Sequence, residues 1–220
     1  CSLDDRLLLN KITNGLVPIY VVPNGVDTDY FQPDANEIME DALVFTGSMD
    51  WLPNDDAITY FCKEILPLIW ERNGKIKLYV VGKSPSQAVK ELAAKDNRVI
   101  VTGRVDDVRP YIVKSKVFVV PLRVGGGTRL KILEAMAMGK AIVSTTIGAE
   151  GIAYRQDENI LLADSPEEFA NKTVNAISDS SRIQTLGKKG RELVLESYDW
   201  RVVGRQLRHF YKKVIDEKNK

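Results

Sequence analysis

The residues best able to do chemistry lie in one segment, residues 121–139, which reads PLRVGGGTRLKILEAMAMG. Its consecutive glycines, Gly125, Gly126 and Gly127, carry no Cβ atoms, so a ligand can approach their backbone closely. Thr128 is expected to be the N-cap of a helix that follows at once. The free N–H groups and the positive end of that helix dipole would then face the glycine loop, an arrangement that favours a bound anion.

Two positive charges strengthen this expectation. Arg129 and Lys131 fall in the first turn of the predicted helix, where the helix dipole disfavours cations. A bound diphosphate would account for their position. We therefore predict that Arg129 and Lys131 are the catalytic residues, which bind a diphosphate and stabilise the negative charge that develops on it as it leaves.

Glu134 is the third charged candidate in this segment. At 3.6 residues per turn it falls between Leu130 and Met138 on an otherwise apolar arc of the helix. A carboxylate there is partly desolvated and needs hydrogen-bond donors, and ribose hydroxyls are suitable ones. The alternative is an intrahelical pair with Lys131, worth about 0.2–0.5 kcal/mol.

The elements that must position these residues alternate along the chain. Near-continuous apolar runs predict strands at 42–48, 77–84, 99–105, 116–127, 141–151 and 159–164, after an opening strand at 16–27. Amphipathic segments predict helices at 56–72, 87–95, 108–115, 128–138 and in three stretches after residue 165. This order predicts an α/β, Rossmann-like parallel sheet of about six strands with helices on both faces.

Local signals refine these elements. Pro67 should distort the helix that contains it, and Gly139 should end the helix that follows the glycine loop. Asp106 and Asp107 should cap the helix after them. Because ligands of open parallel sheets bind at the carboxyl ends of the strands, we expect the site to be built from the loops at 47–48, 82–84, 103–104, 123–127 and 145–151.

Together these motifs resemble the C-terminal, donor-binding domain of family 4 glycosyltransferases, which are retaining enzymes of the GT-B fold. The resemblance is narrowest to the subgroup with GGGTRLKxLEAMAMG in this segment. It extends over nearly the whole chain, through VVPNGVDTDYF, FTGSMDWLPNDDAITYF, VVGKSP, VTGRVDDVRPYI, VSTTIGAEGI and the terminal YDW. It implies one half of a GT-B fold and transfer of a sugar from a nucleoside diphosphate sugar to an acceptor hydroxyl.

The resemblance also assigns roles at the donor site. Glu134 matches the second Glu of the family's Glu-x7-Glu motif and would hold the donor ribose, whereas the first Glu is replaced by Gly126. The strand-end loop that commonly carries an Arg and a Lys reads Gly47-Ser48 here, so we infer that Arg129 and Lys131 replace those charges. The remaining donor contacts are expected from Gly47, Ser48, Gly125, Gly126, Gly127 and Thr128, and around the nucleobase from Gly103, Arg104 and Val105.

The same resemblance predicts the domain organisation. Residues 1–25 would be the link and remnant of an N-terminal domain that binds a carbohydrate or lipid-linked acceptor. Residues 26–198 would form the donor-binding domain, and residues 199–220 a helix that packs on the acceptor domain. An isolated chain of this kind is expected to be inactive. Two alternatives stay open, a nucleotide-sugar epimerase of the same fold and a non-catalytic nucleotide-sugar-binding domain.

Composition excludes other classes of protein. Lys and Arg number 31 and Asp and Glu 30, a net charge of +1, so no charge excess supports nucleic-acid binding. With one His and two Cys at no metal-ligand spacing, we expect no metal and no cofactor besides the donor. No apolar run reaches the roughly 20 residues that span a bilayer, and the expected location is cytoplasmic, with the inner face of the cytoplasmic membrane as an alternative. Gly82-Lys83-Ser84 is no P-loop, because Lys77 stands where the first glycine is needed.

Overall fold

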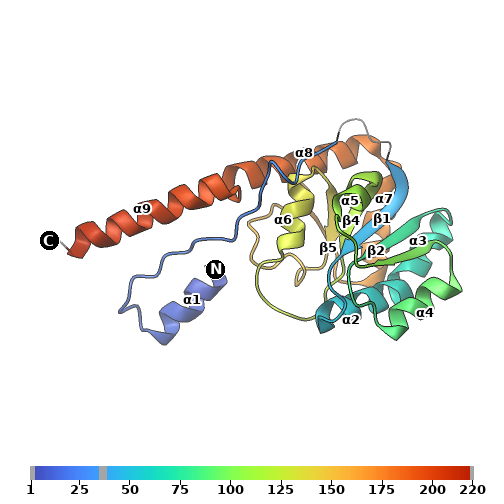
Figure 1. Cartoon of the computed structure of the whole chain (residues 1–220), viewed down its shortest axis with the longest axis horizontal. Coiled ribbons are helices and arrows are strands. Elements are labelled where there is room, and N and C mark those ends of the chain that lie inside the picture. The colour runs from blue at the N-terminus through green and yellow to red at the C-terminus, as the bar shows by residue number, and fades with distance from the viewer. Residues whose placement is uncertain (1–2, 35–38, 219–220) are drawn as a thin grey trace.

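In residues 3–34 and 39–218, the part of the 220-residue chain that the computed structural model describes, six parallel strands form a central sheet (Figure 1). The strands lie in the order β3-β2-β1-β4-β5-β6. Their bounds are β1 Glu40–Thr46, β2 Lys77–Val81, β3 Val99–Gly103, β4 Ser115–Val120, β5 Ala141–Ser144 and β6 Leu161–Leu162. The predicted α/β fold and its six strands are confirmed.

The central strand β1 is covered on both faces. Leu43, Val44 and Phe45 are all fully buried, although successive side chains of a strand point to opposite faces of the sheet. This burial explains why the strand reads as a continuous apolar run rather than an alternating one. β1 pairs with β2 on one side and with β4 on the other, and the strand order reverses between β1 and β4. A crevice is expected at the carboxyl ends of such a pair.

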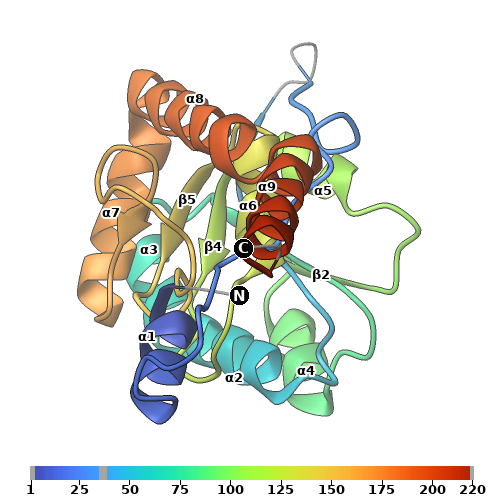
Figure 2. The same ribbon diagram turned by 90° about the vertical axis from the view of Figure 1, so that its left-hand side faces the viewer.

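Helices cover both faces of the sheet, as predicted (Figures 1 and 2). α3 packs against α7 on one side, and α5 contacts β1 and β4 from the other. The helices that come after β1 in the chain are α2 Leu52–Tyr60, α3 Leu66–Arg72, α4 Gln87–Lys95, α5 Arg109–Lys114, α6 Leu130–Ala137, α7 Pro166–Ser178, α8 Ser180–Ser197 and α9 Trp200–Lys218. An additional helix, α1 Leu3–Ile12, precedes the sheet.

The predicted distortion at Pro67 is present. A π-helical turn, η1 Phe61–Ile65, separates α2 from α3, and the N–H of Leu66 donates to the carbonyl of Phe61, five residues earlier. Proline has no N–H to continue the α-helical pattern, so the wider turn just before it takes up the irregularity. Gly139 ends α6 with a φ of 68°, which is the left-handed conformation expected of a glycine after a helix.

Two predictions about local structure outside the glycine loop are wrong. Residues 16–27 form no strand and contribute only an isolated bridge between Val26 and Asp199. Pro18 and Pro23 have no N–H to donate to a sheet, so this segment runs as extended chain. The cap of α5 is Val108 rather than an aspartate.

Asp107 nevertheless serves the start of α5. Its Oδ1 accepts from the N–H of Arg109 at 2.9 Å, and the carboxylate also pairs with the guanidinium of Arg109, 2.7 Å from Nη2. Asp107 therefore takes up one of the free N–H groups of the first turn, although it lies one residue before the cap.

The C-terminal helix α9 extends away from the sheet and lies beside the chain that follows α1 (Figure 1). The rings of Tyr20 and Phe210 stack with their centroids 4.7 Å apart. Part of the apolar face of α9 is exposed, including Leu207, Val214 and Ile215. In the described residues no helix is long and apolar enough to cross a membrane.

Close packing of α8 on the end of α6 gives a test of this arrangement. A Cβ atom on Gly187 would lie 1.9 Å from the carbonyl oxygen of Gly139, so Gly187→Ala is expected to lower the free energy of unfolding by about 1–3 kcal/mol through overpacking. Gly204 in α9 has no atom within 4 Å of such a Cβ, so Gly204→Ala should raise it by about 0.5–1 kcal/mol. Urea unfolding at 25 °C measures both, and equal effects would contradict the packing described.

Candidate functional site

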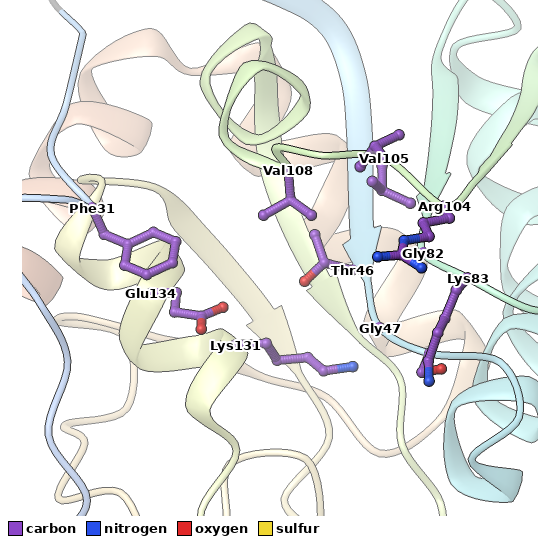
Figure 3. Close-up of a pocket in the computed structure, with 12 residues that line it drawn as sticks. Phe31, Thr46, Gly47, Gly82, Lys83, Arg104, Val105, Val108, Lys131 and Glu134 are labelled. Carbon is purple, nitrogen blue, oxygen red and sulfur yellow. The ribbon is translucent and has the colours of Figure 1, made fainter.

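An open pocket of about 550 Å³ lies at the carboxyl ends of β1 and β2 (Figure 3). The loops that follow β1, β2 and β3 form one wall, and α6 forms the other. Its lining residues are Phe31, Thr46, Gly47, Ser48, Val81, Gly82, Lys83, Arg104, Val105, Val108, Lys131 and Glu134. The pocket therefore lies at the edge of the sheet where parallel-sheet proteins bind ligands.

The structure brings together part of the predicted site. The predicted residues that line the pocket are Gly47, Ser48, Arg104, Val105, Lys131 and Glu134. The predicted residues outside its lining are Gly103, Gly125, Gly126, Gly127, Thr128 and Arg129. The carbonyl of Gly103 instead accepts from the N–H of Gly82 at 3.2 Å, which ties the loop after β3 to the loop after β2.

Lys131 extends from α6 toward the end of β1 (Figure 3). Its Nζ donates to Oδ1 of Asn54 at 2.8 Å and lies 4.0 Å from the ring centroid of Phe45. A Cβ atom on residue 47 would lie 2.7 Å from this Nζ, so Gly47 leaves the room that the ammonium occupies. Burial, together with the charge of Arg129, lowers the pKa of Lys131 from its ordinary value of 10.5 to about 7.

Arg129, rather than Thr128, is the N-cap of α6, so the predicted cap is wrong. Arg129 is extended, with φ −87° and ψ 94°, and its Nη1 donates to the carbonyl of Gly126 at 2.8 Å. That bond folds the side chain back over the glycine loop, and the helix begins one residue later. Thr128 packs against the turn at Gly151, where a Cβ atom would lie 2.7 Å from Oγ1 of Thr128.

Most of the hydrogen-bonding capacity of Arg129 is unused. Its Nε and Nη2 are buried and have no hydrogen-bond partner among the described residues. Buried donors of this kind are rare in native proteins and indicate a bound ion or water. Arg129 is close enough to Lys131 for its charge to lower the pKa of that lysine. The two side chains therefore give a surplus of positive charge at the carboxyl ends of β1 and β4. This arrangement can bind an anion with several oxygens.

Glu134 lies on the same face of α6, one turn from Lys131 (Figure 3). Burial raises the pKa of its carboxyl group, and the charge of Lys131 opposes that rise. The two side chains form no ion pair within 4.0 Å in the part of the chain that the structure describes. The intrahelical pair left open by the sequence is therefore not formed, and the carboxylate remains available to hydroxyl donors in the pocket.

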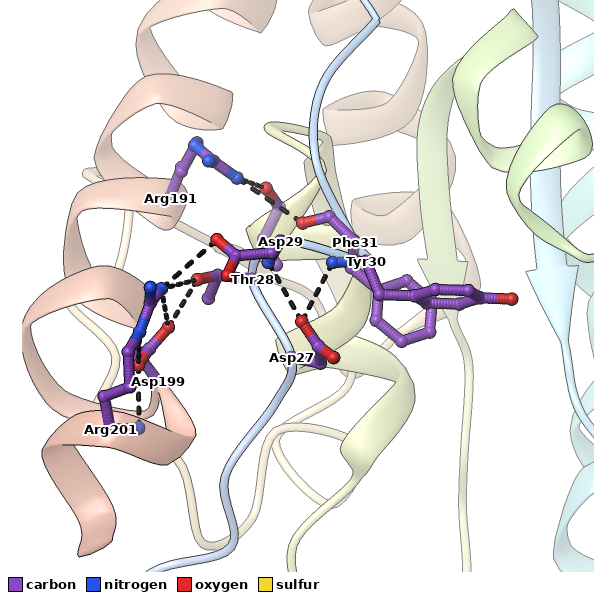
Figure 4. A network of polar contacts seen from close by, with 9 residues as sticks. Asp27, Thr28, Asp29, Tyr30, Phe31, Arg191, Asp199 and Arg201 are labelled. Carbon is purple, nitrogen blue, oxygen red and sulfur yellow. Dashed lines mark hydrogen bonds and ion pairs between the residues drawn. The ribbon is translucent and has the colours of Figure 1, made fainter.

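Phe31 lines the pocket beside Glu134, and the sequence alone did not identify it (Figure 3). Its turn is fixed by Asp27, whose Oδ1 accepts from the N–H groups of Asp29 and Tyr30 at 3.0 and 2.9 Å (Figure 4). Such a turn is typical of aspartate followed by short polar residues. The sequence Asp27-Thr28-Asp29 carries that signal, but its tertiary position does not follow from it.

A polar network holds this turn against the junction of α8 and α9 (Figure 4). The hydroxyl of Thr28 donates to Asp199, whose Oδ2 lies 2.7 Å from Nη2 of Arg201. The guanidinium of Arg201 and the hydroxyl of Thr28 hold the pKa of Asp199 well below its usual range. Arg191 of α8 donates to the carbonyl of Phe31 at 3.5 Å. The apolar wall of the pocket thus depends on residues from the far end of the chain.

The hydroxyl of Ser48 is engaged within its own loop. It donates to Oδ1 of Asp50, and the other carboxylate oxygen lies 3.4 Å from Nζ of Lys83. The backbone carbonyl of Ser48 accepts from Nδ2 of Asn54 at 2.8 Å.

The described residues contain no group of three or more His, Cys, Asp or Glu side chains that could hold a metal ion.

Residues 40–179 match the family model of glycosyl transferases group 1, and the chain belongs to this family. It is 25% identical over 214 residues to a GDP-mannose-dependent α-(1-6)-phosphatidylinositol monomannoside mannosyltransferase of Mycobacterium tuberculosis, a match that covers 86% of this chain and 54% of that protein. The chain spans about half the length of the curated relatives it matches, from 38% to 54%.

Solved structures share the fold. The C-terminal domain of LpcC from Francisella tularensis, a glycosyl transferase group 1 family protein, superposes with a TM-score of 0.65 at 23% identity, over 80% of this chain and 100% of that one. HepE from Anabaena, solved with UDP and glucose, superposes with a TM-score of 0.72 at 16% identity, over 88% of this chain and 56% of that one.

The lowered pKa of Lys131 predicts a pH-dependent stability. Between the folded pKa of about 7 and the ordinary value of 10.5, the unfolded chain holds a proton on this lysine that the folded chain lacks. The stability contributed by this residue therefore rises with pH across that window and is lowest below pH 7. Lys131→Met should stabilise the chain most at pH 6, and its advantage should shrink by at most about 1.4 kcal/mol per pH unit above pH 7.

Urea unfolding at pH 6, 8 and 9 measures this difference. Lys189→Met is the control, because Lys189 lies on the exposed face of α8, 3.0 Å from Glu192, and should give no such pH dependence. A constant difference between wild type and Lys131→Met at the three pH values would contradict the lowered pKa.

Proposed function

We propose that this chain binds a nucleoside diphosphate sugar, and that the protein it belongs to transfers the sugar to a hydroxyl of a carbohydrate or lipid-linked acceptor with retention at the anomeric carbon. The observation that carries the proposal is the pair of cations beside the glycine loop. Arg129 brings a permanent positive charge to the strand ends and Lys131 one that is about half present near pH 7. Nε and Nη2 of Arg129 are buried and have no hydrogen-bond partner among the described residues. A diphosphate supplies both the charge and the acceptor oxygens that this pair lacks.

The pocket has a different chemistry at each end, and the donor parts can be assigned accordingly. In this proposal the nucleobase lies against Arg104, Val105 and Val108, with Phe31 on the side of α6. The ribose hydroxyls donate to Glu134, whose desolvated carboxylate then gains the hydrogen bonds it needs. The diphosphate lies between Lys131 and the backbone of the loop after β1.

The domain's contribution to catalysis is electrostatic. As the bond to the sugar breaks, negative charge grows on the leaving diphosphate, and fixed cations stabilise it without reorganising. Lys131 and Arg129 are held by α6 and the glycine loop, at the edge of the sheet where the leaving diphosphate is proposed to lie. A charge-assisted hydrogen bond contributes about 1.5–3 kcal/mol, so each cation should matter by about one to two powers of ten in affinity.

The acceptor is proposed to bind to a second domain. The relative from Mycobacterium tuberculosis and HepE are each about twice the length that this chain covers, and the match to LpcC is to a C-terminal domain. The exposed apolar residues of α1 and α9, among them Leu7, Leu8 and Leu207, suit packing against such a domain. Residues 1–25 would then form the link, and residues 199–220 the helix that returns to the acceptor domain, and the isolated chain would bind donor without transferring it.

Calorimetric titration with UDP, GDP and ADP tests the binding site. We expect one of these nucleotides to bind with micromolar to millimolar affinity. Arg129→Ala and Glu134→Ala should each weaken that binding about ten- to hundredfold, because each removes a charge-assisted hydrogen bond. Arg155→Ala is the matched control, since this exposed arginine lies on a different loop from Arg129 and pairs with Glu158, 3.6 Å away. Equal weakening by Arg155→Ala, or no nucleotide binding by a folded chain, would contradict the proposal.

Donor binding should also depend on pH. Lys131 is about half protonated near pH 7, and a bound diphosphate favours its charged form, so binding takes up a proton. The affinity for a nucleotide sugar should therefore be highest below pH 7 and fall by about tenfold between pH 7 and 8.5. UDP-glucose and GDP-mannose are suitable probes, because their diphosphates have no titrating group in this range. Lys131→Arg keeps its charge throughout and should give a flat profile, and an equally steep profile in that variant would exclude Lys131 as the cause.

A further inference from the structure

The glycine loop has a carboxylate above it that the donor site described so far does not use. Glu150 follows β5, and both of its carboxylate oxygens lie 3.9 Å from the position that a Cβ atom on Gly126 would take. The side chain is partly exposed. Among the described residues its carboxylate has no hydrogen-bond or ion-pair partner, whereas Asp164 accepts two hydrogen bonds from Thr146.

The backbone around Glu150 is held in place from both sides. Thr145 donates through its hydroxyl to the carbonyl of Leu122, and it accepts from the N–H of Gly148 at 3.0 Å. Thr146 donates to Asp164 through its N–H at 2.8 Å and through its hydroxyl at 2.7 Å.

The next residue, Gly151, packs closely against Thr128, the residue that follows the glycine loop. It has a φ of 77°, and a Cβ atom on it would lie 2.7 Å from Oγ1 and 3.3 Å from the backbone nitrogen of Thr128. Only glycine allows this contact at that φ. Glu150 is therefore presented over the glycine loop by a rigid turn, which is how specificity-determining groups are positioned.

The order of the strands gives the direction in which a bound donor must extend. The pocket that suits the nucleoside is lined from the ends of β1 and β2 and from the loop after β3. The order β3-β2-β1-β4-β5 then places the glycine loop, after β4, and the turn of Glu150, after β5, progressively further from β3. A ligand whose diphosphate lies at Lys131 and Arg129 carries its sugar onward toward β4 and β5, where Glu150 stands.

We propose that Glu150 recognises the transferred sugar of the donor by accepting hydrogen bonds from its hydroxyl groups. This inference rests on the proposed binding of a nucleoside diphosphate sugar. A carboxylate can accept from two adjacent hydroxyls at once, and Glu150 also lines an open hollow of about 590 Å³ with Thr146, Ile147 and Tyr154. Gly126 leaves room for the sugar to approach, because a larger side chain there would extend toward the carboxylate.

The test compares each nucleotide sugar with its own nucleoside diphosphate by calorimetry, with UDP-glucose against UDP and GDP-mannose against GDP. Glu150→Gln keeps the size of the side chain and removes its charge. It should weaken binding of the nucleotide sugar about tenfold and change binding of the nucleoside diphosphate less than twofold. Glu158→Gln is the matched control, because Glu158 is exposed in the following turn and pairs with Arg155.

The outcomes separate this inference from the proposed function. Loss confined to the nucleotide sugar supports the role of Glu150. An unchanged ratio of the two affinities in Glu150→Gln, whether both fall or neither does, overturns that role but not the proposed nucleotide binding of the wild-type chain. Failure of the wild-type chain to bind any of the nucleoside diphosphates overturns the proposed function and this inference together.

Discussion

Two cations stand at the N-terminus of α6, where the helix dipole already contributes partial positive charge. Burial and the charge of Arg129 lower the pKa of Lys131. Nε and Nη2 of Arg129 are buried and have no hydrogen-bond partner among the described residues. The fold maintains this unfavourable arrangement by packing α6 between the sheet and α8, with most of the helix fully buried. An anionic ligand would relieve the repulsion, so the same charges that cost stability in the free chain would favour binding of the proposed donor, a trade-off that is common at functional sites.

The site also joins parts of the chain that are distant in sequence. Thr28 and Asp199, which are 171 residues apart, hold the turn that carries Phe31 into the pocket. Arg191 reaches the same turn from α8. Because α9 begins within this network, a movement of α9 would be transmitted to the wall of the pocket that Phe31 lines.

The fold, and the presence of Lys131 and Glu134 in the pocket, could be predicted from the sequence because their signals are local. Buried strands such as β1 read as continuous apolar runs. Gly139 indicates the end of a helix, and Pro67 indicates a distorted one. The predicted strand at 16–27 is wrong because Pro18 and Pro23 interrupt the apolar run and have no N–H to donate to a sheet. Thr128 is predicted as the cap of α6, but Arg129 takes that position and bonds back to the carbonyl of Gly126. Phe31 and Glu150 could not be found, since their places depend on tertiary contacts with Asp199, Arg191 and Thr128.

In the proposed function Lys131 is a partly buried lysine with a lowered pKa, and a bound diphosphate raises that pKa so that the side chain is fully charged. The most direct measurement is a pH titration followed by NMR of the chain labelled with ¹³C at the lysine Cε atoms, with the Lys131 signal assigned by its absence in Lys131→Arg. We predict that this one signal titrates near pH 7 in the free chain and above pH 9 when UDP-glucose or GDP-mannose, whichever binds, is saturating. A Lys131 signal that titrates near the ordinary lysine value of 10.5, or a midpoint that the donor leaves unchanged, would contradict the account.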